Sequence, residues 1–158
     1  MQSASDTGSG RPATDTAALL LLATTLDGTS QEVLARALAL TQSGATRLVD
    51  RLVRDGLLQR APGPDRRTFA VSTTQAGRDA AQAGLDERAT ACTDLLEVLD
   101  TSERQALTGI LEKLLQGLPT SRSEAYRICR LCDPIACGHD QGRCPVTRGV
   151  DAVDQPCP

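Results

Sequence analysis

Residues 30–56 read SQEVLARALALTQSGATRLVDRLVRDG, and residues 57–72 continue with LLQRAPGPDRRTFAVS. The first part has the spacing of two short helices joined by a tight turn, with Ser30 and Thr41 as N-cap residues and Gly56 as the stop. The second part contains two strand-like runs separated by proline, glycine and aspartate at 62–65, which is turn chemistry. Two helices followed by a hairpin predict a winged helix-turn-helix.

The second of these helices, residues 42–55, has the clearest periodicity in the chain. Its apolar residues form one stripe, and they are Ala45, Leu48, Val49, Leu52 and Val53. Arg47, Arg51 and Arg54 stand at i, i+4 and i+7, so they project together. A charged row alone usually indicates a solvated surface. Its position between another helix and a hairpin instead favours a helix that enters a DNA groove.

The charge distribution supports the same interpretation. The chain has 158 residues and a net charge of -3. Between Ser30 and Ala80, however, eight arginines oppose five acidic residues, so this window is basic and the remainder is acidic. A basic region in an acidic chain is the electrostatic signature of a nucleic-acid face.

The predicted fold is mainly α with a small β-hairpin wing: a winged helix-turn-helix plus long dimerisation helices. A first helix is expected at 14–26, a long helix at about 74–99, and a further helix that ends near Leu118. Asp100 and Glu103 have capping-box spacing. The predicted segments are a disordered leader (1–13), a winged helix-turn-helix DNA-binding domain (14–80), dimerisation helices (81–120) and a cysteine-rich metal-binding tail (121–158).

Several classes of protein do not match this sequence. No apolar run is long enough to span a membrane, and the short run 17–23 lacks the layout of a signal peptide. We therefore expect a cytoplasmic protein, in which cysteines are usually thiols or metal ligands rather than disulfides. The chain has one histidine, no nucleophile–base pairing and no phosphate loop, so we expect no enzymatic activity.

Three motifs resemble the MarR family of bacterial transcriptional regulators: TQSGATRLVDRL at 41–52, DRR at 65–67 and VSTTQAG at 71–77. The resemblance covers about residues 14–118. It implies a homodimer that binds a pseudo-palindromic, double-stranded operator, with the recognition helix in the major groove and the wing arginine, Arg67, in the minor groove. Asp65 is expected to brace the wing.

The predicted DNA-binding positions lie on the recognition helix and at the hairpin tip, and they are Thr41, Gln42, Ser43, Thr46, Arg47, Arg51, Arg54, Asp65, Arg66 and Arg67. Two features depart from the family pattern. Family members usually have a long helix ahead of the first helix predicted here, and this sequence has too few residues before Thr14 to form it. The cysteine-rich tail is an addition to the family pattern. Dimerisation is therefore expected through the last two long helices.

The tail contains Cys129, Cys132, Cys137 and Cys144, separated by two, four and six residues. Residues 121–132 are predicted to form a capped helix that places Cys129 and Cys132 on one face. The other two cysteines follow in glycine-containing loops that can fold back. The four sulfurs are therefore expected to converge on one centre.

Three interpretations of this centre remain open. The preferred one is an iron–sulfur cluster, 4Fe-4S in type, because it needs four thiolates, occurs with several ligand spacings and can have a proline after one ligand, as Pro145 follows Cys144. Structural zinc prefers paired short knuckles, of which one is present. The third is a thiol-based redox sensor without metal. A metal centre is favoured over free thiols because four clustered cysteines left unligated are open to oxidation. Cys92 is expected to pack in a helical seam, and Cys157 to be peripheral.

The sequence therefore predicts a DNA-binding regulator, a repressor, whose four-cysteine centre senses redox state or metal. An electron-transfer protein with an incidental winged helix and an interaction module with structural zinc are the competing classes. Ligation is expected to order the tail and to alter the spacing of the two recognition helices, which must match major grooves about 34–36 Å apart.

Overall fold

The computed structural model of the chain describes residues 11–63 and 69–154. The chain divides into two compact units, Met1–Asp86 and Glu87–Pro158. Helix α4 (Gln75–Leu96) contributes residues to both units. In neither described stretch is there a helix whose length and apolar character would let it cross a membrane.

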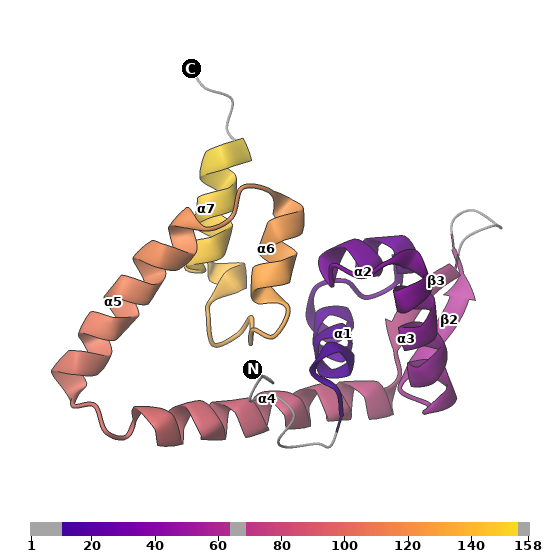
Figure 1. Cartoon of the computed structure of the whole chain (residues 1–158), viewed down its shortest axis with the longest axis horizontal. Coiled ribbons are helices and arrows are strands. Elements are labelled where there is room, and N and C mark those ends of the chain that lie inside the picture. Colours follow the sequence, from indigo (N-terminus) through magenta and orange to yellow (C-terminus); the bar gives the residue numbers. More distant parts are fainter. Residues whose placement is uncertain (1–10, 64–68, 155–158) are drawn as a thin grey trace. The chain divides into compact units, whose positions relative to one another are not determined.

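The first unit is a winged helix, as the sequence predicts. Its elements are α1 (Ala13–Thr24), β1 (Thr29–Ser30), α2 (Gln31–Ala37), α3 (Gln42–Arg54), β2 (Leu58–Pro62), β3 (Phe69–Thr73) and the first part of α4 (Figure 1). Within the described residues the antiparallel sheet has the order β1-β3-β2. The short strand β1, which pairs Thr29 with Val71, was not predicted from the sequence.

Helix α1 forms the centre of this unit. Its residues 17–22 are all buried, so the helix is enclosed on every side rather than amphipathic. Leu34 of α2, Val49 and Leu52 of α3 and Val71 of β3 are among the most deeply buried side chains around it. Ala45, Leu48, Val49 and Leu52 of the α3 stripe are buried in this core and Val53 is half-buried, so the opposite face of the helix remains at the surface.

The caps predicted for α2 and α3 are present in the structure. Ser30 Oγ accepts a hydrogen bond from the Val33 amide at 3.3 Å, and Thr41 Oγ1 accepts one from the Gly44 amide at 3.1 Å. Gly56 has φ +73°, the left-handed conformation that ends a helix at low cost. Helix α4 ends at Leu96, three residues before the predicted boundary.

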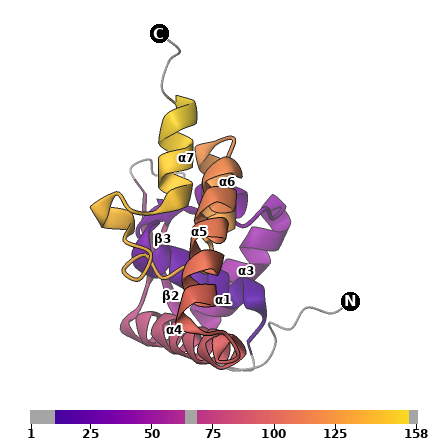
Figure 2. The same cartoon turned by 90° about the vertical axis from the view of Figure 1, so that its left-hand side faces the viewer.

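The second unit contains α5 (Thr101–Gly117), α6 (Arg122–Cys129), a short 3-10 turn (His139–Gln141) and α7 (Pro145–Asp154). The Asp100–Glu103 capping box is present, with both reciprocal hydrogen bonds. Helix α7 packs against α5 and α6 (Figures 1 and 2). The approach to α5 is close, because a Cβ at Gly149 would overlap the Gln116 carbonyl. Helix α7 was not predicted from the sequence.

One prediction about the tail is wrong. Helix α6 ends at Cys129, so Cys132 does not share a helical face with it. A single turn follows, in which the Cys132 amide donates to the Cys129 carbonyl at 2.8 Å. The helix cannot continue because Pro134 disfavours helical backbone in the residue before it, and Asp133 caps the next turn through the amides of Ile135 and Ala136.

The long helices expose apolar residues in the single chain. Helix α5 has no buried residue, and Ile110, Leu111, Leu114 and Leu118 are 46–59% exposed. Cys92 is also exposed, so the prediction that it packs in a core is wrong for the isolated chain. The described buried residues of α4 are Gly77, Ala81 and Gly84, all in its first half.

Candidate nucleic-acid interface and cysteine pocket

The exposed face of α3 contains most of the predicted DNA-contacting residues that the structure describes. Thr41, Gln42, Ser43, Arg47 and Arg54 are exposed. Thr46 is half-buried because its hydroxyl accepts a hydrogen bond from Gln31 Nε2 at 2.7 Å and donates to the Gln42 carbonyl at 2.9 Å. The helix therefore presents a polar N-terminal end, which is the part of a recognition helix that reads base edges.

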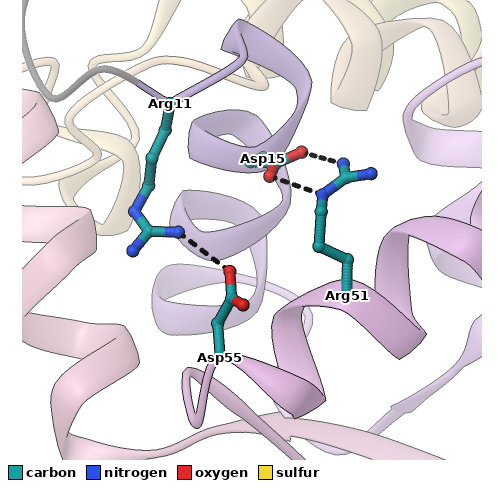
Figure 3. Close-up of polar contacts among 4 residues, drawn as sticks. All are labelled: Arg11, Asp15, Arg51 and Asp55. Atoms are coloured by element: carbon teal, nitrogen blue, oxygen red, sulfur yellow. Dashed lines mark hydrogen bonds and ion pairs between the residues drawn. The ribbon is translucent and has the colours of Figure 1, made fainter.

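Arg51 has a different environment from Arg47 and Arg54. Its guanidinium donates two hydrogen bonds to Asp15 of α1, one of them from Nε to Oδ2 at 3.1 Å (Figure 3). Asp15 is only 2% exposed, whereas the Arg51 side chain is 44% exposed. This hydrogen bond, opposed by partial burial, raises the pKa of Arg51. Arg51 thus ties α3 to the central helix α1.

Two further ion pairs hold the helix at its end and at its side. Arg11 Nη1 lies 3.3 Å from Asp55 Oδ2 (Figure 3). Asp50 Oδ1 lies 2.5 Å from Arg60 Nη2 and so joins α3 to strand β2. Asp15, Asp50 and Arg60 were not predicted to have a role, because their partners are not neighbours in the sequence and spacing alone does not reveal the pairs.

These pairings leave Arg47 and Arg54 as cations available to a ligand. Neither has an ion-pair partner among residues 11–63 and 69–154. Both lie on the exposed side of α3, two turns apart. Unpaired arginines on an exposed helix face suit phosphate oxygens of a nucleic-acid backbone. The predicted wing contacts Asp65, Arg66 and Arg67 lie outside the described residues.

The second unit brings the four predicted cysteines to one pocket. Its volume is about 340 Å³, and its lining includes Cys129, Cys132, Cys137 and Cys144 together with Leu115 of α5. Cys129 ends α6 and Cys144 precedes α7, so the pocket lies between helix ends. His139 does not line the pocket; its Nδ1 lies 3.0 Å from Thr147 Oγ1.

The thiols differ in their ionisation. A hydrogen bond from Cys129, assisted by the positive charge of Arg88, lowers the pKa of Cys132 to about 6. The same hydrogen bond raises the pKa of Cys129 far above its usual value. Burial and the neighbouring Cys144 raise the pKa of Cys137 to about 11. Cys132 is therefore the thiol of this set that ionises most readily, and thiolates are the ligands of soft metals.

The spacing of the side chains around the pocket bears on the kind of group that they could hold. Among the described residues, no three His, Cys, Asp or Glu side chains stand at the spacing of a single bound metal ion. Four sulfurs that each bind one zinc at about 2.3 Å must be about 3.8 Å apart. Thiols are soft donors that suit either zinc or an iron–sulfur cluster. Two arginines near the pocket were not singled out from the sequence: Arg143, which directly precedes Cys144, and Arg88, which lies on α4 far from the cysteines in the sequence.

Comparison with known proteins places the first unit in a family. Residues 9–68 match the family model described as the MarR family. A probable transcriptional regulator from Pseudomonas aeruginosa is 34% identical over 68% of this chain and 80% of its own, with a TM-score of 0.54.

A mutant form of MarR from E. coli is 24% identical over 66% of this chain and 78% of its own, with a TM-score of 0.61. S. aureus MepR in complex with DNA is 24% identical over 68% of this chain and 80% of its own, with a TM-score of 0.54. No curated protein matches the sequence. The winged-helix geometry, the family match and the Pseudomonas relative agree: the chain belongs to the MarR family of transcriptional regulators.

Proposed function

We propose that the protein binds operator DNA as a homodimer in the cytoplasm and regulates transcription, acting as a repressor. The observation that carries this proposal is the exposed face of α3, where Arg47 and Arg54 remain available while the other described charges of the helix are paired within the protein. Steric exclusion is the physical basis for repression, because a dimer that occupies a promoter blocks other proteins from the same grooves.

The exposed apolar residues of α4 and α5 support the dimer. Leu95 at the end of α4 and Val98 just after it are 74% and 85% exposed. Helix α5 exposes three more large apolar side chains, Ile110, Leu111 and Leu114, and Leu118 follows directly after it. Contiguous exposed apolar surface of this kind marks an interaction site. A second copy of the chain would cover it and would give the two-fold symmetry that a pseudo-palindromic site requires. S. aureus MepR, which has a similar fold, has been solved in complex with DNA.

The DNA proposal can be tested by the salt dependence of binding. Duplexes selected from a random pool are measured by fluorescence anisotropy with wild type, Arg47→Ala and Arg54→Ala. Removal of one phosphate interaction from each half of a dimer should lower the slope of log K against log salt by about 1.8. Arg104→Gln, an equal charge change in the second unit, is the control. Unchanged slopes in both α3 variants would remove the assignment of this helix face.

The finer part of the proposal is that the four cysteines hold an iron–sulfur cluster of the 4Fe-4S type and that its state alters DNA binding. A cavity needs about 10–15 Å³ of this kind of volume to hold one water-sized group, so a cavity many times larger has room for a group of several atoms. The pocket volume of about 340 Å³ exceeds what one zinc ion needs, which favours the larger group. A bound cluster supplies a one-electron redox change and sensitivity to oxidants.

The protein's own contribution is the arrangement of the ligands. Cys129 and Cys144 are attached to helix ends, and α7 packs on α5, the helix with the exposed apolar face. Ordering of the loop between them therefore acts on the helix expected to contact the second copy. This is the physical route by which the state of the pocket and operator affinity become linked.

Anaerobic purification followed by absorption spectroscopy and iron, sulfide and zinc analysis tests this part. Cys132→Ser and Cys137→Ser should lose bound iron and change operator affinity, whereas Cys92→Ser, the matched thiol outside the pocket, should retain both. Stoichiometric zinc without iron would replace the cluster by a structural zinc site. Wild-type metal content in both pocket variants would overturn the ligand assignment.

A further inference from the structure

Arg88 of α4 contacts the cysteine loop from outside the cysteine spacing. Its Nη1 donates a hydrogen bond to the carbonyl of Leu131, which lies between Cys129 and Cys132. The two residues are separated by 43 positions in the sequence, and both belong to the second unit. This hydrogen bond links α4 to the loop that contains two of the four thiols.

A second arginine lies at the pocket itself. Arg143 is part of the lining, and its side chain lies across Gly138, which has φ +67°. A Cβ at Gly138 would come within 2.7 Å of Arg143 Nε, so the guanidinium occupies the space that the glycine leaves open. Glu112 is the carboxylate of the lining. The surroundings of the four thiols therefore include the positive charges of Arg88 and Arg143.

We infer that Arg88 is a positioning residue for the cysteine centre: it anchors the Cys129–Cys132 segment to α4 and provides positive charge that favours the reduced state. This inference rests on the proposed iron–sulfur centre. Reduction brings in one electron from an external one-electron donor, with no bond formed or broken. A cation beside the ligand loop stabilises the added negative charge, so Arg88 raises the reduction potential.

The contact also gives the loop a route to the DNA-binding unit along the chain. Helix α4 begins at Gln75, where Thr74 Oγ1 donates to the Gly56 carbonyl at 2.7 Å, and it is continuous to Leu96. An anchor at Arg88 therefore joins the loop to the same helix that starts beside the recognition helix. The cysteine loop is therefore bonded to the helix that links the two units along the chain.

The charge role is tested by potentiometric titration of the anaerobic holoprotein, followed by its absorption spectrum. Arg88→Gln should shift the reduction equilibrium about tenfold toward the oxidised state, which is 59 mV for one electron. Arg88→Lys keeps the charge and should restore most of the shift, although it lacks the planar fork of donors. Arg148→Gln, an exposed arginine of the same unit that does not line the pocket, should match wild type. Equal potentials in Arg88→Gln and wild type would overturn the charge role.

The anchoring role is tested without metal. In the metal-free full chain, hydrogen exchange is measured for the amides of Cys132, Ile135 and Ala136, which are hydrogen-bonded in the loop. Arg88→Gln should accelerate their exchange about tenfold, whereas Arg148→Gln should not. Unchanged exchange in Arg88→Gln would overturn the anchor even if the wild type binds iron. If the wild type binds no iron, the charge role fails together with the centre, and exchange still decides the anchor.

Discussion

The ion pair between Asp15 and Arg51 predicts an asymmetric response to mutation (Figure 3). Asp15 is 2% exposed, and the Arg51 side chain is 44% exposed. Removal of the aspartate leaves an arginine that water can reach. Removal of the arginine leaves a carboxylate inside the protein without its two strongest hydrogen bonds. The two single variants should therefore lose different amounts of stability.

The magnitudes follow from these exposures. Asp15→Ala loses hydrogen bonds to a charged group, at about 1.5–3 kcal/mol. Arg51→Met keeps the aliphatic stem but strands a buried charge, at about 3–5 kcal/mol. The double variant Asp15→Leu with Arg51→Met removes both charges and should be more stable than Arg51→Met alone. The matched control is Arg11→Ala, because its pair with Asp55 is 35% and 37% exposed and contributes about 0–1 kcal/mol.

Urea unfolding of the full chain gives the overall free energy of unfolding. The transition is followed by circular dichroism because the sequence has no tryptophan for fluorescence. Hydrogen exchange of the α3 amides reports the local part. A cost for Arg51→Met no larger than that for Arg11→Ala would refute the interpretation of Asp15–Arg51 as the anchor of the recognition helix. A double variant less stable than both single variants would refute the stranded-charge argument.

Two further predictions concern backbone packing and thiol reactivity. Gly77→Ala should destabilise the fold by about 1–3 kcal/mol, because its Cβ would overlap the Leu57 carbonyl. A Cβ at Gly109 meets nothing within 4 Å, so Gly109→Ala should stabilise α5 by about 0.5–1 kcal/mol. Equal melting temperatures of the two variants in thermal unfolding would contradict this prediction. In metal-free protein, iodoacetamide should modify Cys132 before Cys137 at pH 7, with a half-maximal rate near pH 6, because the lowered pKa makes Cys132 a thiolate above that pH. A midpoint near pH 9 for Cys132, by mass spectrometry, would exclude the hydrogen-bonded thiolate.

Local signals were sufficient to predict the winged helix. The apolar stripe of α3, the caps at Ser30 and Thr41 and the left-handed Gly56 depend on residues within a few positions of one another. Short-range backbone geometry leaves few alternatives for such a pattern, so the helices and the hairpin lie within a few residues of their predicted bounds. The Asp100–Glu103 capping box is confirmed for the same reason.

Errors occurred where a boundary or a partner depends on distant residues. The helix predicted to reach Cys132 ends at Cys129, although Pro134 was visible as a signal against its continuation. Helix α7 was missed because Val146 and Val150 form a short stripe whose burial against α5 is a tertiary event. Cys92 was assigned to a core that the single chain does not contain.

The sequence by itself determined the order of the helices and strands, the polar face of α3 and the four cysteines as one set, because these features follow from spacing along the chain. Only the tertiary structure decided how the charges are used. It pairs Arg51 with the buried Asp15, leaves Arg47 available, and brings Arg88 to the Leu131 carbonyl. The physical reason is that charge pairing depends on distance in space and on exclusion of water, and the folded chain sets both.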